Sequence, residues 1–176
     1  MLLMSSSLKN RPIMSLRSGN QIGLAIEPII NPHNLKILGW WSNLANNKAL
    51  QVLLTEDIRE VMPQGLAIND EGDLSTPEDL VRHKDILEAK FQLIDKAVKT
   101  KRQKLGKVSD FSYNDGMFVQ KLYVSKPITK VFSSEDTHVI DRSQIIEVTD
   151  TYILVEDTEV RATDEEAVPA GAAATS

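Results

Sequence analysis

The feature that most constrains this fold is a short pattern that occurs twice in a chain of 176 residues. Each copy places a glycine after an apolar residue, a second apolar residue two positions later, and an acidic residue four positions after the glycine. The two stretches are Ile22-Gly-Leu-Ala-Ile-Glu27 and Leu105-Gly-Lys-Val-Ser-Asp110. Because repetition at this spacing is the mark of repeated structural units, the chain is predicted to contain two copies of one fold.

The later parts of the two copies also correspond. Val52–Val61 matches Val139–Val148, and Leu66–Asp70 matches Ile153–Asp157, with apolar and acidic positions in agreement. A small difference in length falls between the matched parts, where loops tolerate insertions. The sequence therefore predicts a tandem duplication.

Each copy has the pattern of short β-strands. Gln120–Val124 alternates between apolar and polar residues, and Asn114-Asp-Gly116 is a strong hairpin signal because these residues tolerate positive φ. Ile145–Val148 and Tyr152–Val155 predict a second hairpin. We expect the shared motif to be structural, with bends or close backbone approach at the glycines. Its positions are Gly23, Gly106, Val108, Asp110, Asn114 and Gly116.

A helix is predicted between the copies, where Thr76 can cap its start and Pro77 suits its first position. Beyond Asp157 the chain is acidic and then rich in alanine, which is typical of disorder. The predicted organisation is a flexible tail, a first unit, a linker helix, a second unit and a disordered tail. Their respective ranges are 1–12, 13–71, 72–90, 91–157 and 158–176.

Composition restricts the function classes. The net charge of -5 argues against a dedicated non-specific nucleic-acid binder. The absence of cysteine excludes disulfides and thiolate chemistry, and it suits a cytoplasmic location. The chain offers no apolar run of the roughly 18–20 residues needed to cross a bilayer.

The glycine signature, the hairpin after it and the final pair of strands resemble the PRC-barrel family. The match is good over about 90–157 and looser over about 13–70. The resemblance implies a mainly β protein of two tandem small antiparallel PRC-type β-barrels joined by a short helix-containing linker. The family includes the cytoplasmic part of a reaction-centre subunit and the C-terminal domain of a ribosome maturation factor. Its domains act in docking or assembly rather than catalysis.

Candidate partner-binding residues are Trp40, Trp41 and Tyr123. Since neighbours in a strand point to opposite faces, one tryptophan is expected in the core and the other outside it. The outer one could anchor a partner or pack against the helix or the other barrel. Tyr123 is expected opposite the core-facing Leu122 and Val124.

The candidate surface for anions is a basic run, which could attract RNA or an anionic membrane. The alternative is a solvated hairpin edge on which lysine prevents edge-to-edge pairing. No aromatic residue interleaves the run, which argues against a base-stacking surface within it. The run consists of Lys99, Lys101, Arg102, Lys104 and Lys107.

No catalytic, cofactor-binding or metal-binding residue is predicted. The spacing of the acidic residues matches no known metal or catalytic motif. The three histidines lack metal-ligand spacing as well. Asp110 and Asp115 are each explained by local turns or bends.

The sequence thus predicts a cytoplasmic, non-enzymatic scaffold or adaptor that docks an unidentified protein through a barrel face. One alternative is a ribosome-assembly or rRNA-maturation factor that contacts a ribosomal protein and RNA. A further alternative is a peripheral component of a membrane-associated complex. The oligomeric state is left open.

Overall fold

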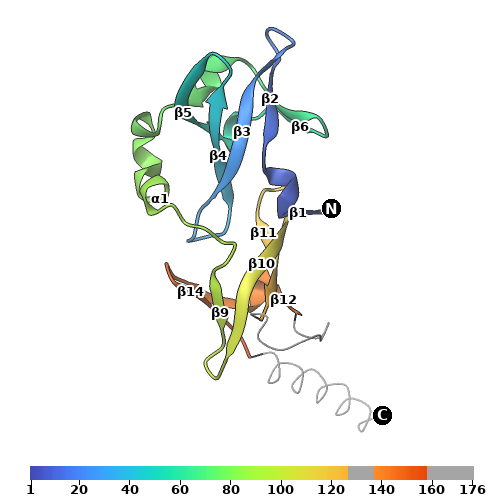
Figure 1. Ribbon diagram of the computed structural model, residues 1–176, viewed down its shortest axis with the longest axis vertical. Coiled ribbons are helices and arrows are strands. Elements are labelled where there is room, and N and C mark those ends of the chain that lie inside the picture. The colour runs from blue at the N-terminus through green and yellow to red at the C-terminus, as the bar shows by residue number, and fades with distance from the viewer. Residues whose placement is uncertain (127–136, 158–176) are drawn as a thin grey trace, which may run out of the picture. The chain divides into compact units, whose positions relative to one another are not determined.

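The computed structural model of the chain describes residues 1–126 and 137–157 and is mainly β (Figure 1). It divides into two compact units. Unit 1 comprises Met1–Leu93 and Asp110–Lys121, and unit 2 comprises Ile94–Ser109 and the described residues from Leu122 on. The domain boundaries predicted from the sequence stay a prediction, and the predicted tail over 158–176 lies outside the described residues.

Unit 1 is built on a seven-stranded sheet with the order β6-β7-β2-β3-β4-β5-β8. Neighbouring strands are antiparallel except for β2 and β7, which run parallel. The strands are β2 (Arg11–Ser15), β3 (Gln21–Ile30), β4 (Ile37–Leu44), β5 (Asn47–Leu54), β6 (Glu60–Met62), β7 (Gly65–Ile68) and β8 (Leu74–Ser75).

The second sheet has the order β12-β11-β10-β9-β14-β13, and β1 pairs with β10 beside this path. Again one pair, β9 and β14, is parallel. The strands are β1 (Leu2–Met4), β9 (Ala97–Lys99), β10 (Lys104–Asn114), β11 (Val119–Ser125), β12 (Thr137–Asp141), β13 (Ile145–Val148) and β14 (Tyr152–Val155).

The two sheets have the same strand order when β6, β7, β2, β3, β4 and β5 are set against β13, β14, β9, β10, β11 and β12. Their registers agree as well. Ile13 pairs with Gly23 on one side and Leu66 on the other. Val98 pairs in the same way with Gly106 and Ile153. The repeated glycine therefore occupies one register position in both sheets.

Two closed antiparallel barrels are not confirmed by the strand pairings of the described residues. Each sheet contains a parallel pair, and one sheet is curled into a half-barrel. The sequence could not show this, because alternation identifies a strand and its buried face but not the direction of its neighbour. In the first sheet β7 returns beside β2 in the same direction, and in the second sheet β14 returns beside β9 in the same way.

The flexible tail predicted over residues 1–12 is wrong. Leu2–Met4 pairs with β10, Ser5–Leu8 forms a short 3-10 helix (η1), and β2 begins at Arg11. Leu8 is 1% exposed, so this segment contributes to the core of unit 1. A single buried leucine in a serine-rich run carries too little periodicity to predict a packed segment.

The predicted linker helix is divided into three short pieces. They are η4 (Pro77–Asp79), η5 (Val81–His83) and α1 (Lys84–Ala89). Leu80 interrupts the run with a ψ of 61°, far from a helical value, and the Thr76 side chain makes no capping hydrogen bond. The longest helix within residues 1–126 and 137–157 has six residues, and none there qualifies as a membrane span.

Short 3-10 turns complete the connections. Asp141 caps one of them in a capping box with Gln144. Asp70 caps another, because its carboxylate accepts a hydrogen bond from the backbone N–H of Gly72. These turns are η2 (Thr55–Asp57), η3 (Glu71–Asp73) and η6 (Arg142–Gln144).

Candidate functional site

The adjacent tryptophans of β4 point to opposite faces of the first sheet, because strand neighbours alternate. Trp40 is 1% exposed, and its indole Nε1 donates a hydrogen bond to the carbonyl of Leu8 at 2.8 Å. Trp41 is partly buried and pairs with Val52 on β5. Trp40 is thus a core residue, and Trp41 belongs to a second, more open surface.

The segment that contains η4, η5 and α1 packs against the face that carries Trp41. Leu87 of α1 is buried together with Ile29, Val52 and Leu54. The partly buried residues around them are Leu38, Trp41, Leu80 and Ile86. Alternation along β5 explains the arrangement, since Val52 and Leu54 share a face with their cross-strand neighbour Trp41.

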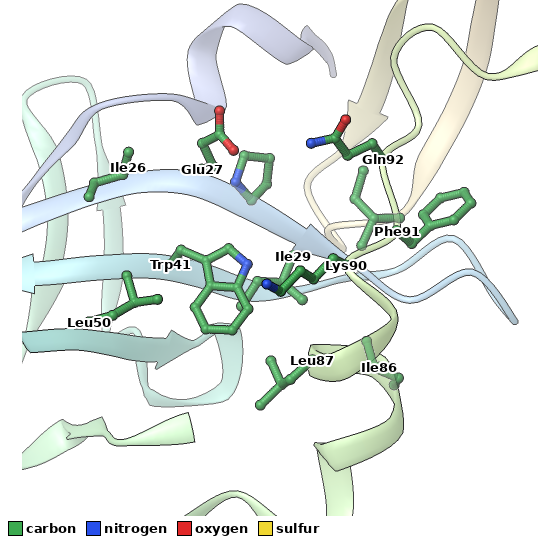
Figure 2. A pocket seen from close by; sticks show the side chains of 12 residues that line it. Ile26, Glu27, Ile29, Trp41, Leu50, Ile86, Leu87, Lys90, Phe91 and Gln92 are labelled. Carbon is green, nitrogen blue, oxygen red and sulfur yellow. The ribbon is translucent and has the colours of Figure 1, made fainter. Parts of the chain in front are cut away.

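This packing is incomplete and leaves two hollows that share Trp41, Leu87 and Lys90. The first, of about 340 Å³, is shown in Figure 2, where Trp41 faces Leu87 and Lys90 across the gap between sheet and helix. It is lined by Ile26, Glu27, Pro28, Ile29, Ile30, Trp41, Leu50, Ile86, Leu87, Lys90, Phe91 and Gln92. The second, of about 480 Å³, is lined by Trp41, Pro77, Glu78, Leu80, Val81, Lys84, Leu87, Glu88 and Lys90. We call the two hollows together the Trp41 groove.

The charged side chains of the groove lie at its rim. Glu27 is 3.8 Å from Lys9, and Lys84 is 3.8 Å from Glu88 one helical turn away. Lys90 is exposed and adopts a left-handed conformation, with φ 48°, immediately after α1. The floor is therefore apolar, and the charges surround it.

A strand edge runs beside the groove. On its outer side β5 pairs with β8 only at Val52 and Leu53. The preceding part of β5, Asn47–Leu50, is exposed, and Leu50 is 51% exposed while it lines the groove. Backbone groups at such an edge can accept an additional strand.

The remaining sequence-predicted binding residues belong to unit 2 and are not among the residues that line the groove. Tyr123 is partly buried on β11. In the basic run, the Lys99 ammonium group lies 3.8 Å from the centre of the Tyr152 ring, and Arg102 is 3.5 Å from the Asp157 carboxylate. Lys101, Lys104 and Lys107 are exposed.

The glycines of the repeated motif lie against the backbone of a neighbouring strand. A Cβ on Gly23 would lie 2.1 Å from the carbonyl oxygen of Asn43, and one on Gly106 would lie 2.2 Å from that of Ser125. Gly106 also has φ +137°, which side-chain-bearing residues rarely adopt. Both positions therefore require glycine for packing.

The other motif residues have local structural contacts. Val108 is buried, and the Asp110 carboxylate accepts hydrogen bonds from the backbone N–H of Phe111 and from the Ser5 hydroxyl. The Asn114 side chain accepts one from the N–H of Phe118 across the hairpin turn that contains Gly116.

Among the ionisable groups of the described residues, the Asp57 carboxyl has a clearly perturbed pKa. Burial raises the pKa of this carboxyl, and the negative charges of Glu56 and Asp73 raise it further, while Arg59 acts in the opposite direction. Asp57 does not line the groove. In the described ranges, 1–126 and 137–157, no group of histidine, cysteine or acidic side chains is arranged to hold a metal ion.

Sequence reasoning missed most of the groove. Trp41 is the groove residue that the sequence identifies as a binding candidate. Leu50 and Lys90 carry no signal in the sequence, because their positions depend on tertiary packing. A comparison with protein-family models gives no match, and a comparison with curated proteins gives none either.

Proposed function

We propose that this chain is a non-enzymatic protein-binding module that docks an apolar segment of a partner protein in the Trp41 groove. The observation that carries the proposal is a partly buried tryptophan that forms a shared wall of two apolar hollows. A large aromatic side chain in such a place can contribute a large share of binding free energy, because a partner that covers it excludes water.

The composition of the groove supports binding rather than chemistry. Its floor consists of aliphatic and aromatic side chains. Three of its rim charges are held in ion pairs, Glu27 with Lys9 and Lys84 with Glu88. Apolar pockets with a few polar groups at the rim are typical of recognition sites. Lys90 and Glu78 at the rim would set the orientation of the partner.

The exposed edge of β5 supports a specific binding mode. An extended partner segment could add to the backbone of Asn47–Leu50 while its side chains enter the groove beside Leu50. In this mode the backbone hydrogen bonds supply affinity and the pockets supply specificity.

A relation to the PRC-barrel family, with tandem barrel-like units, stays part of this proposal. It is supported by the common strand order of the two sheets and by the glycine at the same register position in each. A cytoplasmic location is proposed with it, because a chain without cysteine suits a reducing compartment.

The experiment is site-specific photo-crosslinking in native lysate. A photoreactive phenylalanine analogue replaces Leu50 at the groove in one protein and Val61 on β6 in the other, since these two side chains are 51% and 49% exposed. We expect a discrete polypeptide adduct at position 50 that survives high salt and nuclease, with little at position 61. Mass spectrometry of the adduct then identifies the partner segment.

Loss of the adduct in a Trp41→Ala background, with an unchanged far-ultraviolet circular dichroism spectrum, would assign docking to the groove. Equal labelling at positions 50 and 61, or an adduct that disappears with nuclease, would contradict the proposal.

A further inference from the structure

A second surface, independent of the Trp41 groove, lies on the solvent-facing side of the sheet in unit 2. We call it the outer face, and it is defined by Lys99, Lys104, Lys107, Tyr123 and Tyr152. The side chains on the opposite side are buried, among them Val98, Val108, Leu122, Val124 and Ile153. The outer-face residues come from four neighbouring strands in the order β11, β10, β9 and β14.

The strand register places the lysines and Tyr152 on one side. Lys104 is directly opposite Lys99, and Lys107 is opposite Ala97, two residues before Lys99. Tyr152 is the parallel partner of Ala97 on the other side of β9. Side chains of residues that pair directly share a face, and so do residues two apart in one strand.

A β-bulge explains why Lys104 and Lys107, which are three residues apart on β10, lie on the same face of the sheet. Residues three apart in a regular strand face opposite sides, yet Lys104 and Lys107 are both exposed, and Leu105 and Val108 are both buried. The register shift between Lys104 and Gly106, together with φ +137° at Gly106, reverses the alternation at this point. The repeated glycine thus brings two cations to one surface.

Tyr123 lies on the same face, as the hydrogen bonds of Ser109 and Ser125 indicate. The Ser109 hydroxyl donates to the carbonyl of Tyr123 at 3.0 Å, and the Ser125 hydroxyl donates to the Ser109 hydroxyl at 3.1 Å. Ser109 lies two residues after Lys107, and Ser125 lies two residues after Tyr123, so all four residues face the same side.

The lysines do not serve as protection for a strand edge. In the sheet order, β9 lies between β14 and β10, and β10 lies between β9 and β11. Edge protection, which the sequence suggested as part of the alternative for the basic run, therefore does not account for Lys99, Lys104 and Lys107, which lie on these inner strands. The aromatic residues that the run itself lacks are supplied by the strands on either side.

Charge is distributed unevenly between the units. The described residues of unit 2 include eight lysine and arginine against six aspartate and glutamate residues, whereas unit 1 has ten against thirteen. Six of the eight cations of unit 2 lie between Lys96 and Lys107. A chain with net charge -5 thus keeps a positive surface where the outer face lies.

From this arrangement we infer that the outer face binds single-stranded nucleic acid. Lys99, Lys104 and Lys107 contact phosphates, and the Tyr123 ring stacks on a base. Tyr152 acts as a positioning residue, because its ring holds the Lys99 ammonium group by a cation–π contact at 3.8 Å. Four strands about 4.8 Å apart span roughly 14 Å, and four-stranded sheets of RNA-binding domains stack two or three bases on such a surface.

Fluorescence anisotropy of the full chain with a labelled 12-nucleotide oligouridylate tests this inference. We expect saturable binding whose affinity falls with salt, with a slope of about −2 for log K against log salt, because each phosphate contact contributes about −0.7 in single strands. Lys104→Glu combined with Lys107→Glu should weaken binding at least tenfold at low salt. Tyr123→Ala should weaken it about fivefold or more, since it removes one stacked base.

The matched control makes the same change in net charge in unit 1. Lys9→Glu combined with Lys48→Glu should leave the affinity for the oligonucleotide within twofold of the wild-type value. Thermal melts establish that each variant is folded, and Tyr123→Phe, which keeps the ring, should restore the affinity. The inference is overturned by an absence of binding, by equal losses in the two charge variants, or by equal affinity for a duplex of the same length. Binding to phosphatidylserine vesicles without binding to the oligonucleotide would overturn it in favour of a lipid surface.

Discussion

At the scale of single residues, the two adjacent tryptophans have different structural roles. Trp40 fills the core and satisfies the Leu8 carbonyl, while Trp41 lines a groove. The alternation of a strand predicts that the two differ. Which one is buried could not be predicted, because that depends on the side from which η1 and α1 approach the sheet.

Trp40→Phe is expected to lower the free energy of unfolding by about 2–4 kcal/mol, because it leaves a cavity and an unsatisfied buried carbonyl. Trp41→Phe should cost less than about 1 kcal/mol, since Trp41 is partly exposed and lines an open groove rather than the core. Urea denaturation followed by circular dichroism measures both. Equal losses would contradict the assignment of Trp40 to the core.

Gly106→Ala is expected to destabilise the protein by roughly 2–4 kcal/mol, through both a backbone clash and a strained φ. Gly19→Ala is the matched control, because Gly19 has φ +72° but open space around its Cβ position. It should cost only about 1 kcal/mol. A Gly106→Ala variant as stable as Gly19→Ala in thermal melts would contradict the close approach of Gly106 to the Ser125 backbone.

Asp57 gives a prediction of pH dependence. Because its pKa is raised in the folded state, the folded protein binds this proton more tightly than the unfolded chain does. The contribution is fully present below the ordinary pKa of 3.8 and is lost as the pH rises through the raised value. Asp57→Asn should therefore stabilise the protein at pH 7 and leave its stability at pH 3 unchanged. Stabilisation of equal size at both pH values would contradict this account.

At the scale of elements, the sequence predicted the strands well. The hairpin at Asn114–Gly116 and the pair Ile145–Val148 and Tyr152–Val155 lie where alternation and turn residues predicted them. The predicted helix failed because its N-terminal signals, Thr76 and Pro77, begin a 3-10 turn that Leu80 then interrupts. Local capping signals locate a helix start but do not ensure that the helix continues.

Lys90 ends α1 in a left-handed conformation, with φ 48°. Lys90→Gly should raise the stability of the protein by about 0.5–1 kcal/mol, because glycine adopts this conformation without strain. Glu88→Gly, inside α1, should lower it by about the same amount. Chemical denaturation measures both changes. A loss of stability in Lys90→Gly would contradict the left-handed conformation of Lys90 at the end of α1.

At the scale of the whole molecule, two sheets with one strand order present different outer surfaces. On the first sheet, α1 and its preceding turns pack over Trp41 and leave a groove. On the second, the corresponding surface carries lysines and tyrosines. The repeated sequence pattern predicted the common strands and the glycine. It could not predict the surfaces, because the residues that differ between the copies are the exposed ones.

The central claim, that the Trp41 groove docks a protein segment, is tested most directly by the affinity of the crosslinked partner segment for wild-type protein and for Trp41→Ala. Isothermal titration at low and high salt gives both dissociation constants. We predict at least a tenfold weaker constant for Trp41→Ala at either salt concentration, since the lost contact is apolar. An unchanged dissociation constant in Trp41→Ala would contradict the claim.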